Sequence, residues 1–221
     1  MNFLQLLFID ELRGFYKSKV MIFLWIGLPL ITIIMHFLYS NTGQAIPFTA
    51  ISAIVVSSLA GTLASVMLVV SIINEKNRHV YELFLIRPLK RQLIIIAKFL
   101  AVFSCVTVAS FLAIAMGIAA DYFALGRLPE AVLGDTVQSL TISLSMMAIS
   151  SAAGVLIGVV SPSILVGVVL VIYGGNQISV IPVLPSILNI DNPVLFTICA
   201  GALTSVVLLI LAIYAFNGKQ F

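Results

Sequence analysis

The stretch that decides the fold runs from Thr49 to Ile73 and reads TAISAIVVSSLAGTLASVMLVVSII, without a charged residue. A bilayer hydrocarbon core of about 30 Å is crossed by about 20 residues of α-helix, so this stretch is long enough to span a membrane. The residues that follow it, 74–92, carry five of the chain's eleven lysines and arginines and two of its eight acids. Such a charge-dense segment must lie in water beside a membrane face.

The whole chain has the composition of an integral membrane protein. Its 221 residues are 62% apolar with a mean hydropathy of +1.22, and only 9% are charged, against about 25% in soluble domains. Further uncharged stretches of spanning length are 20–39, 99–120, 136–160, 194–216 and an interrupted one, 163–183. The sequence therefore predicts an all-α membrane protein with six transmembrane helices in a single domain, residues 1–221. The first stretch lacks a small-residue cleavage pattern, which indicates a retained span rather than a signal peptide.

The distribution of positive charge predicts the orientation of these spans. Ten of the eleven cations fall on one side of the membrane, and only Arg127 falls on the other. Because cations are enriched in cytoplasmic loops, we expect a multi-pass protein of the cell membrane with both termini and residues 74–92 in the cytoplasm. Residues 1–19 are expected to form an amphipathic helix at the interface, the alternative being a simple extension of the first span. Lys98 is expected to extend its ammonium group from the third span to water.

Residues 74–92 have the pattern of a short amphipathic helix. Helical spacing places one apolar side opposite a charged side, with Arg78 and Glu82 on the charged side, and Pro88 ends the helix. The apolar side consists of Val80, Tyr81, Leu83 and Phe84. This helix could lie flat on anionic lipid, or it could present its ridge to a soluble protein.

The same segment resembles a known family. Glu75-Lys76, Glu82-Leu83-Phe84-Leu85, Pro88 and then Lys98 resemble the pattern after the second span of type-2 permeases of ABC transporters, the exporter-like permeases. The chain has His79-Val80 where many members have Gly-Thr. The resemblance implies that residues 74–92 form a cytoplasmic coupling helix that docks on an ATPase. The residues then expected to dock are Glu75, Arg78, Tyr81, Glu82, Phe84, Leu85 and Pro88.

The resemblance also implies partners and a mechanism. The chain contains no GxxxxGK[ST] phosphate loop, so it is not expected to be an enzyme or to bind a cofactor, and ATP and magnesium are expected in a separate ATPase subunit. The family further implies a second permease copy or paralogue, because one six-span chain makes half of a pathway. ATP-driven motion of the ATPases would then move substrate by alternating access. No nucleic-acid partner is expected.

Small residues recur at a spacing of four in two of the predicted spans. This spacing lets membrane helices approach closely, within one chain or between two copies. The residues are Ser57, Gly61 and Ser65, and Ser150, Gly154 and Gly158. The serines at 139, 143, 145, 150 and 151 could line a polar path, but bonds to their own backbone are the favoured interpretation.

The segment before the last span is rich in glycine and proline. We expect the helix to break at Gly174-Gly175 and again at Pro182 and Pro185, since lipid cannot replace lost backbone hydrogen bonds. A bent or re-entrant segment over residues 174–193 would then cap the pathway as an outer gate, the alternative being an ordinary external loop.

Other function classes find less support in the sequence. Catalysis needs a nucleophile with a base, paired acids or a metal cluster, and the chain has no HExxH or GxSxG motif. Cys105 and Cys199 lie in predicted spans and are expected to pack as small apolar residues, with no metal site. The alternative that the sequence leaves open is a membrane anchor or assembly factor for an ATPase, which would look nearly the same.

Overall fold

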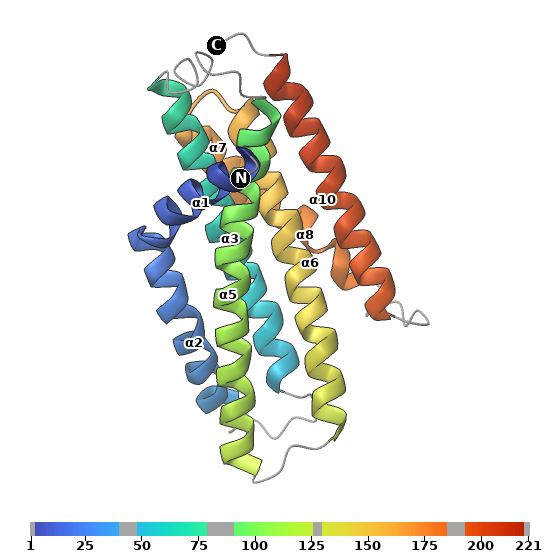
Figure 1. Cartoon of the computed structure of the whole chain (residues 1–221). Coiled ribbons are helices and arrows are strands. Elements are labelled where there is room, and N and C mark those ends of the chain that lie inside the picture. Colours follow the sequence, from blue (N-terminus) through green and yellow to red (C-terminus); the bar gives the residue numbers. More distant parts are fainter. Residues whose placement is uncertain (1–2, 40–47, 79–90, 126–129, 185–192, 219–221) are drawn as a thin grey trace.

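The computed structural model describes residues 3–39, 48–78, 91–125, 130–184 and 193–218. Within these ranges all regular secondary structure is helical (Figure 1). The long helices are α1 (Phe3–Tyr16), α2 (Lys19–Tyr39), α3 (Phe48–Asn77), α5 (Arg91–Leu125), α6 (Glu130–Val160) and α10 (Pro193–Asn217). Between α6 and α10 lie α7 (Ile164–Leu170), a π-helical turn η1 (Val171–Gly175), α8 (Asn176–Ser179) and a 3-10 turn η2 (Ile181–Val183).

Five of these segments are long and apolar enough to cross a membrane. They are 54–77, 92–119, 137–160, 164–183 and 194–217. A sixth candidate is the pair α1 and α2, which bends by 68° at the break between them. The predicted all-α membrane fold is thus confirmed at this level, and α1 is not a straight extension of α2.

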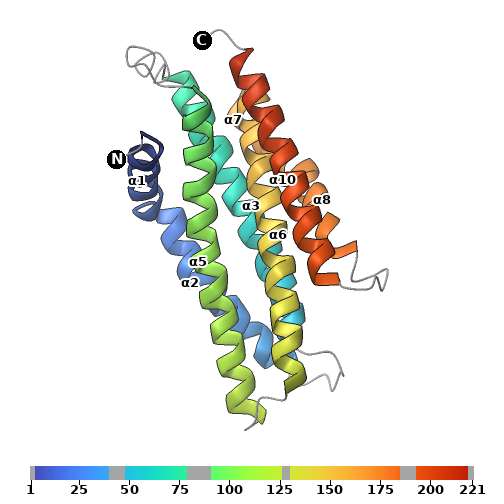
Figure 2. The same cartoon turned by 45° about the vertical axis from the view of Figure 1, so that its right-hand side comes forward.

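The helices form an elongated bundle with α6 near its middle (Figures 1 and 2). Helix α6 packs between α3 and α10, and 78% of its spanning window is buried, against 17% for α10 and 22% for 164–183. Helix α1, the end of α3, the start of α5 and the end of α10 all lie at one end of the bundle, which we call the α1 end. The start of α1 and the end of α10 therefore lie toward the same end of the bundle.

The two rows of small residues meet each other within one chain. A Cβ atom added to Gly154 on α6 would lie 2.6 Å from the Cα of Ser65 on α3, and one added to Gly61 would lie 3.0 Å from the Cβ of Ser150. One added to Gly158 would lie 3.2 Å from the Cα of Val69. Lipid tails are as apolar as leucine, so close backbone approach of this kind is what holds membrane helices together.

A second close contact joins α6 and α10. A Cβ atom added to Gly201 of α10 would lie 2.6 Å from the Cβ of Ser145 on α6. Thr197, Gly201 and Ser205 also follow one another at a spacing of four, a row that the sequence analysis did not single out. The contact fixes α10 against α6 although most of α10 is exposed.

The break predicted at Gly174-Gly175 is wrong. The chain stays helical to Ser179, and Gly175 has helical angles of φ −61° and ψ −40°. Unlike proline, glycine keeps its N–H group, so the backbone bonds can continue; the Asn176 N–H bonds the Val171 carbonyl five residues earlier and closes a π turn. The regular helix ends only at Val180, before the 3-10 turn that contains Pro182, and Pro185 lies outside the described residues.

The close packing of α3 and α6 yields a prediction about stability. The change Gly154→Ala should lower the free energy of unfolding in detergent by about 1–3 kcal/mol, because the new methyl group meets the backbone of Ser65. The matched control is Gly174→Ala, where the added Cβ meets no atom within 4 Å. Thermal unfolding of both variants beside the parent protein measures the difference, and equal effects of the two changes would contradict the packing.

Candidate functional site

Lys98 is the charged side chain that the bundle encloses most completely. It lies seven residues, or about 10 Å, into α5, and only 1% of it is exposed. The prediction that its ammonium group reaches water is therefore wrong. Its aliphatic chain and ammonium group point between helices, because two carboxylates from other helices lie within ion-pair distance there.

The ammonium group of Lys98 joins three helices. Its Nζ lies 2.8 Å from Oε1 of Glu11 on α1 and 2.5 Å from Oε1 of Glu75 on α3. It also donates to Oγ of Ser71 at 3.4 Å, and Ser71 Oγ in turn donates to Glu75 Oε1 at 3.2 Å. All three donors of the ammonium group thus have acceptors, which is what a buried charge requires. We call Glu11, Ser71, Glu75 and Lys98 the ion cluster.

The bend between α1 and α2 brings Glu11 to this cluster. The Ser18 N–H bonds the carbonyl of Phe15 at 3.0 Å as α1 ends, and the Met21 N–H bonds Ser18 Oγ at 3.4 Å as α2 begins. Ser18 therefore acts as the N-cap of α2. Phe15 is buried, and its ring centroid lies 5.8 Å from Lys98 Nζ, which adds a cation–π contact.

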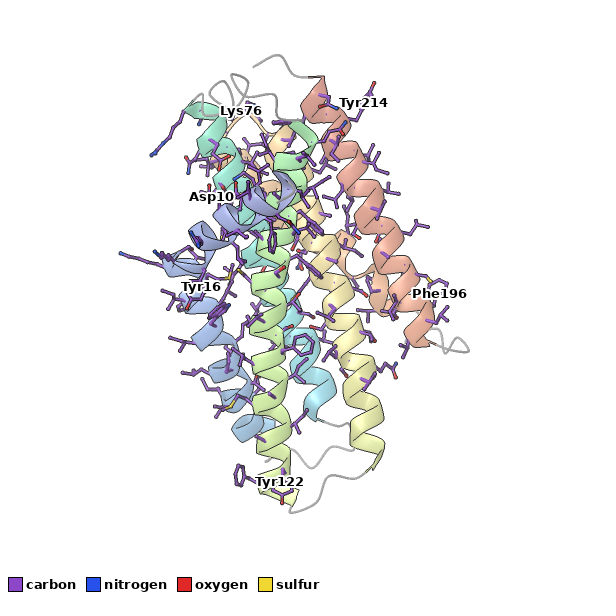
Figure 3. All side chains as sticks on the ribbon, viewed as in Figure 1. Asp10, Tyr16, Lys76, Tyr122, Phe196 and Tyr214 are labelled. Atoms are coloured by element: carbon purple, nitrogen blue, oxygen red, sulfur yellow. The ribbon has the colours of Figure 1, made fainter. Side chains whose placement is uncertain are left out.

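The rest of α1 lies against the core along one side. Leu7, Phe8 and Leu12 pack on the main hydrophobic cluster, while Asp10 and Tyr16 are exposed. Figure 3 shows α1 with Asp10 and Tyr16 labelled, crossing the upper part of the bundle above α2. Phe8 and Leu12 thus follow the amphipathic pattern predicted for residues 1–19, whereas the exposed Tyr16 and the inward-facing Glu11 depart from it.

The ion cluster holds two carboxylates and one ammonium group. The side chains of Glu11 and Glu75 are 23% and 25% exposed, so both reach the surface that Lys98 does not. Burial raises the pKa of Glu11, and the charge and hydrogen bond of Lys98 oppose this rise. The negative charges of Glu75 and Asp10 add to it.

The predicted docking residues are only partly described. Glu75 lies in the last turn of α3 with its carboxylate directed inward to Lys98, and Arg78 follows the helix and is exposed. The Arg78 N–H bonds the Asn74 carbonyl at 3.0 Å. The others, which lie outside the described residues, are Tyr81, Glu82, Phe84, Leu85 and Pro88. The described ends of α3 and α5 nevertheless fix where residues 79–90 begin and end, at the α1 end of the bundle.

Sequence reasoning missed Glu11 as a functional residue. From the sequence, Lys98 is expected to reach water, although a lysine at the start of an apolar stretch can instead be paired with an anion inside the protein. The available signal was Glu11, an acid on the apolar side of α1 near Leu7, Leu12 and Phe15. An acid in that position indicates a buried cation opposite it.

The predicted outer gate is a helical surface in the structure. A Cβ atom added to Gly175 would lie 3.9 Å from the side chains of Ala153 and Ile157 of α6. Pro182 is buried, and its carbonyl accepts a hydrogen bond from Thr197 Oγ1 of α10 at 3.2 Å. The structure thus brings Gly175 and Pro182 against the bundle, while a Cβ atom at Gly174 would meet nothing within 4 Å.

The buried serines divide into two groups. Several donate to carbonyls three or four residues earlier, as Ser65 Oγ does to Gly61 at 2.8 Å and Ser110 Oγ does to Thr107 at 2.8 Å. Four hydroxyl groups have no hydrogen-bond partner among the described residues: Ser143, Ser150, Ser151 and Ser161. The first three follow α6 along its buried course, where they would be the polar positions of any path through the bundle.

The part of the chain that the structure describes holds no group of three or more His, Cys, Asp or Glu side chains that could bind a metal. Cys105 is buried and Cys199 is exposed. Comparison with protein-family models gives no match, and no curated protein matches the chain significantly. The candidate site is therefore defined by geometry alone, as the ion cluster beside the charged segment 74–92.

The cluster predicts how α1 responds to substitution. Changing Lys98→Met should destabilise the folded protein by about 3 kcal/mol, because two carboxylates lose their shared cation. The matched control is the triple change Lys98→Met, Glu11→Gln and Glu75→Gln, which removes all three charges and should recover most of the loss. Unfolding in detergent, with proteolysis between α1 and α2 as a local probe, tests both, and equal stability of the two variants would contradict the ion cluster.

Proposed function

We propose that the chain is the membrane-spanning permease subunit of an ATP-driven exporter of the ABC type-2 kind. Its residues 74–92 would dock on a separate ATPase that binds ATP and magnesium, and a second permease copy or paralogue would complete the pathway. The observation that carries the proposal is the placement of the ion cluster beside the charged segment 74–92. Residues 75 to 98 are also those that resemble the family.

The ion cluster supplies a mechanical route from the docking segment into the bundle. Glu75 lies at the start of the segment, on α3, and Lys98 follows the segment on α5, so an ion pair joins the two helices that flank residues 79–90. Glu11 joins α1 to the same ammonium group. A force on residues 79–90 would therefore move α1, α3 and α5 together rather than bend one helix, as rigid-body alternating access requires.

Close packing passes this motion on to the rest of the bundle. Helix α3 is held to α6 by the contacts of Gly61 and Gly154, and α6 is held to α10 by that of Gly201. The segment 174–185, with Gly174, Gly175, Pro182 and Pro185, lies between the last two spans and would act as the outer gate of the proposed pathway. In this scheme Gly175 and Pro182 would respond to movements of α6 and α10 respectively.

The orientation can be tested by labelling. We propose that the α1 end faces the cytoplasm, because cations concentrate there. Single cysteines at Thr42 and Glu130, in a background without Cys105 and Cys199, should react with an impermeant thiol reagent in intact cells, and one at Asn77 should react only after lysis. The opposite pattern would reverse the topology.

The docking surface can be tested by changing one apolar residue to an acid. The change Phe84→Asp should reduce recovery of the ATPase with the purified permease at least tenfold, because a charge replaces an apolar anchor. The matched control is Phe123→Asp at the opposite end of α5, where Phe123 is 86% exposed. Affinity purification from native membranes, with the ATPase identified by its nucleotide-binding motif and ATP hydrolysis, measures both.

Three outcomes of that experiment are distinct. Loss of the ATPase with Phe84→Asp alone supports the docking surface. Equal recovery with both variants would place docking elsewhere, and absence of any ATPase with the parent chain would contradict the permease proposal. Transport by the purified complex in vesicles separates the permease from an anchor that only holds an ATPase at the membrane.

A further inference from the structure

An apolar groove lies beneath the bend between α1 and α2. It has a volume of about 290 Å³, opens to the outside of the bundle, and is bounded by α1, α2 and α5. Its lining residues are Leu12, Arg13, Tyr16, Trp25, Ser104, Cys105 and Val108. We call it the α1 groove. Arg13 is the charged residue among those that line it.

The polar groups inside the α1 groove are already bonded to the protein. Ser104 Oγ donates to the Leu100 carbonyl at 2.7 Å, and the Trp25 indole N–H donates to the Cys105 carbonyl at 3.2 Å. The ring of Tyr16 meets that of Trp25 edge to face at 5.2 Å. With these two donors engaged, the groove offers an occupant mainly apolar contact, which suits a hydrocarbon chain.

A positive charge, that of Arg13, lines the groove. Arg13 is exposed at its rim, and among the described residues no carboxylate lies within ion-pair distance of its guanidinium group. Lys17 and Lys19 are also exposed at the bend, whereas Asp10 is the exposed acid of α1 and does not line the groove. Glu11 is engaged by Lys98. The rim thus favours an anion over a neutral or cationic group.

We propose that the α1 groove binds an anionic phospholipid, with one acyl chain between α2 and α5 and the phosphate on Arg13. Apolar depth beside an exposed guanidinium group matches the two parts of such a lipid, because arginine binds phosphate through paired N–H donors. Tyr16 and Trp25 lie where the acyl chains meet the headgroups, as aromatic residues do at membrane interfaces. The site needs only that the chain is embedded in a bilayer, and it is independent of an ATPase partner.

The groove also connects a bound lipid to the ion cluster through α1. Leu12 and Arg13 line the groove, and they directly follow Glu11 in α1. A bound lipid would therefore hold α1 from its membrane side while Lys98 holds it from the bundle side. The lipid would act as a second anchor for α1.

The chain carries its own probe for this site, because Trp25 is its one tryptophan and lines the groove. The purified full chain is placed in nanodiscs of phosphatidylcholine that contain increasing fractions of phosphatidylglycerol or phosphatidylcholine brominated on the acyl chain. Bromine quenches tryptophan fluorescence on contact. We expect the brominated phosphatidylglycerol to bind beside Trp25 about fivefold more strongly than the brominated phosphatidylcholine, the preference that one cation near the surface supplies.

Four variants locate the bound lipid and the source of its preference. Arg13→Gln should lower the ratio to about one, whereas Arg13→Lys should retain most of it because the charge remains. Arg78→Gln removes a positive charge from the same end of the bundle, outside the groove, and should leave the ratio unchanged. Val108→Phe should reduce quenching by both lipids, because the larger side chain fills the groove.

Each outcome decides the proposal. A ratio near one in the parent protein would show ordinary lipid contact and overturn it. A high ratio that survives Arg13→Gln would overturn the assignment to this rim. A high ratio that Arg13→Gln abolishes and Arg13→Lys retains, in variants with parental helix content and elution volume, establishes the site.

Discussion

The structure depends on one buried cation. Removing an ammonium group from water costs several kcal/mol, and the cost is recovered only with well-placed anions. Lys98 meets this condition with Glu11 and Glu75, which come from two other helices. The position of α1 follows from this requirement, because without Glu11 the buried charge would lose a close partner and α1 would lose its polar attachment to the bundle.

Packing in the remainder of the bundle obeys a different constraint. Helices in lipid gain little from burying apolar side chains, so they associate where their backbones can approach closely. Gly61, Gly154 and Gly201 supply such places along α6 and its two neighbours. The bundle therefore combines a closely packed centre around α6 with the ion cluster, which joins α1, α3 and α5 at the α1 end. A force applied near Glu75 would act on both the ion cluster and the close contacts of α6.

Much of this architecture could be predicted from local sequence, but the ion cluster could not. Span positions and the Ser57 to Ser65 and Ser150 to Gly158 rows follow from hydropathy and helical spacing, which are properties of one helix at a time. The partnership of Glu11 with Lys98 depends on the 68° bend at Ser18, and neither spacing nor composition encodes that angle. The helix break predicted at Gly174-Gly175 was wrong for a related reason. Glycine lacks a side chain but keeps its backbone N–H group, so tertiary packing decides whether the helix continues.

The π turn at Val171–Gly175 has a consequence for the faces of the fifth span. A π turn accommodates one more residue than an α-helical turn, and one residue corresponds to a rotation of about 100°. The side chains after Gly175 are therefore rotated relative to an unbroken α-helix. Ser179 and Pro182 are buried there, and the Pro182 carbonyl accepts a hydrogen bond from Thr197 Oγ1. The π turn thus precedes the segment in which η2 meets α10, and the apolar surface of α7 does not continue along the same line into α8.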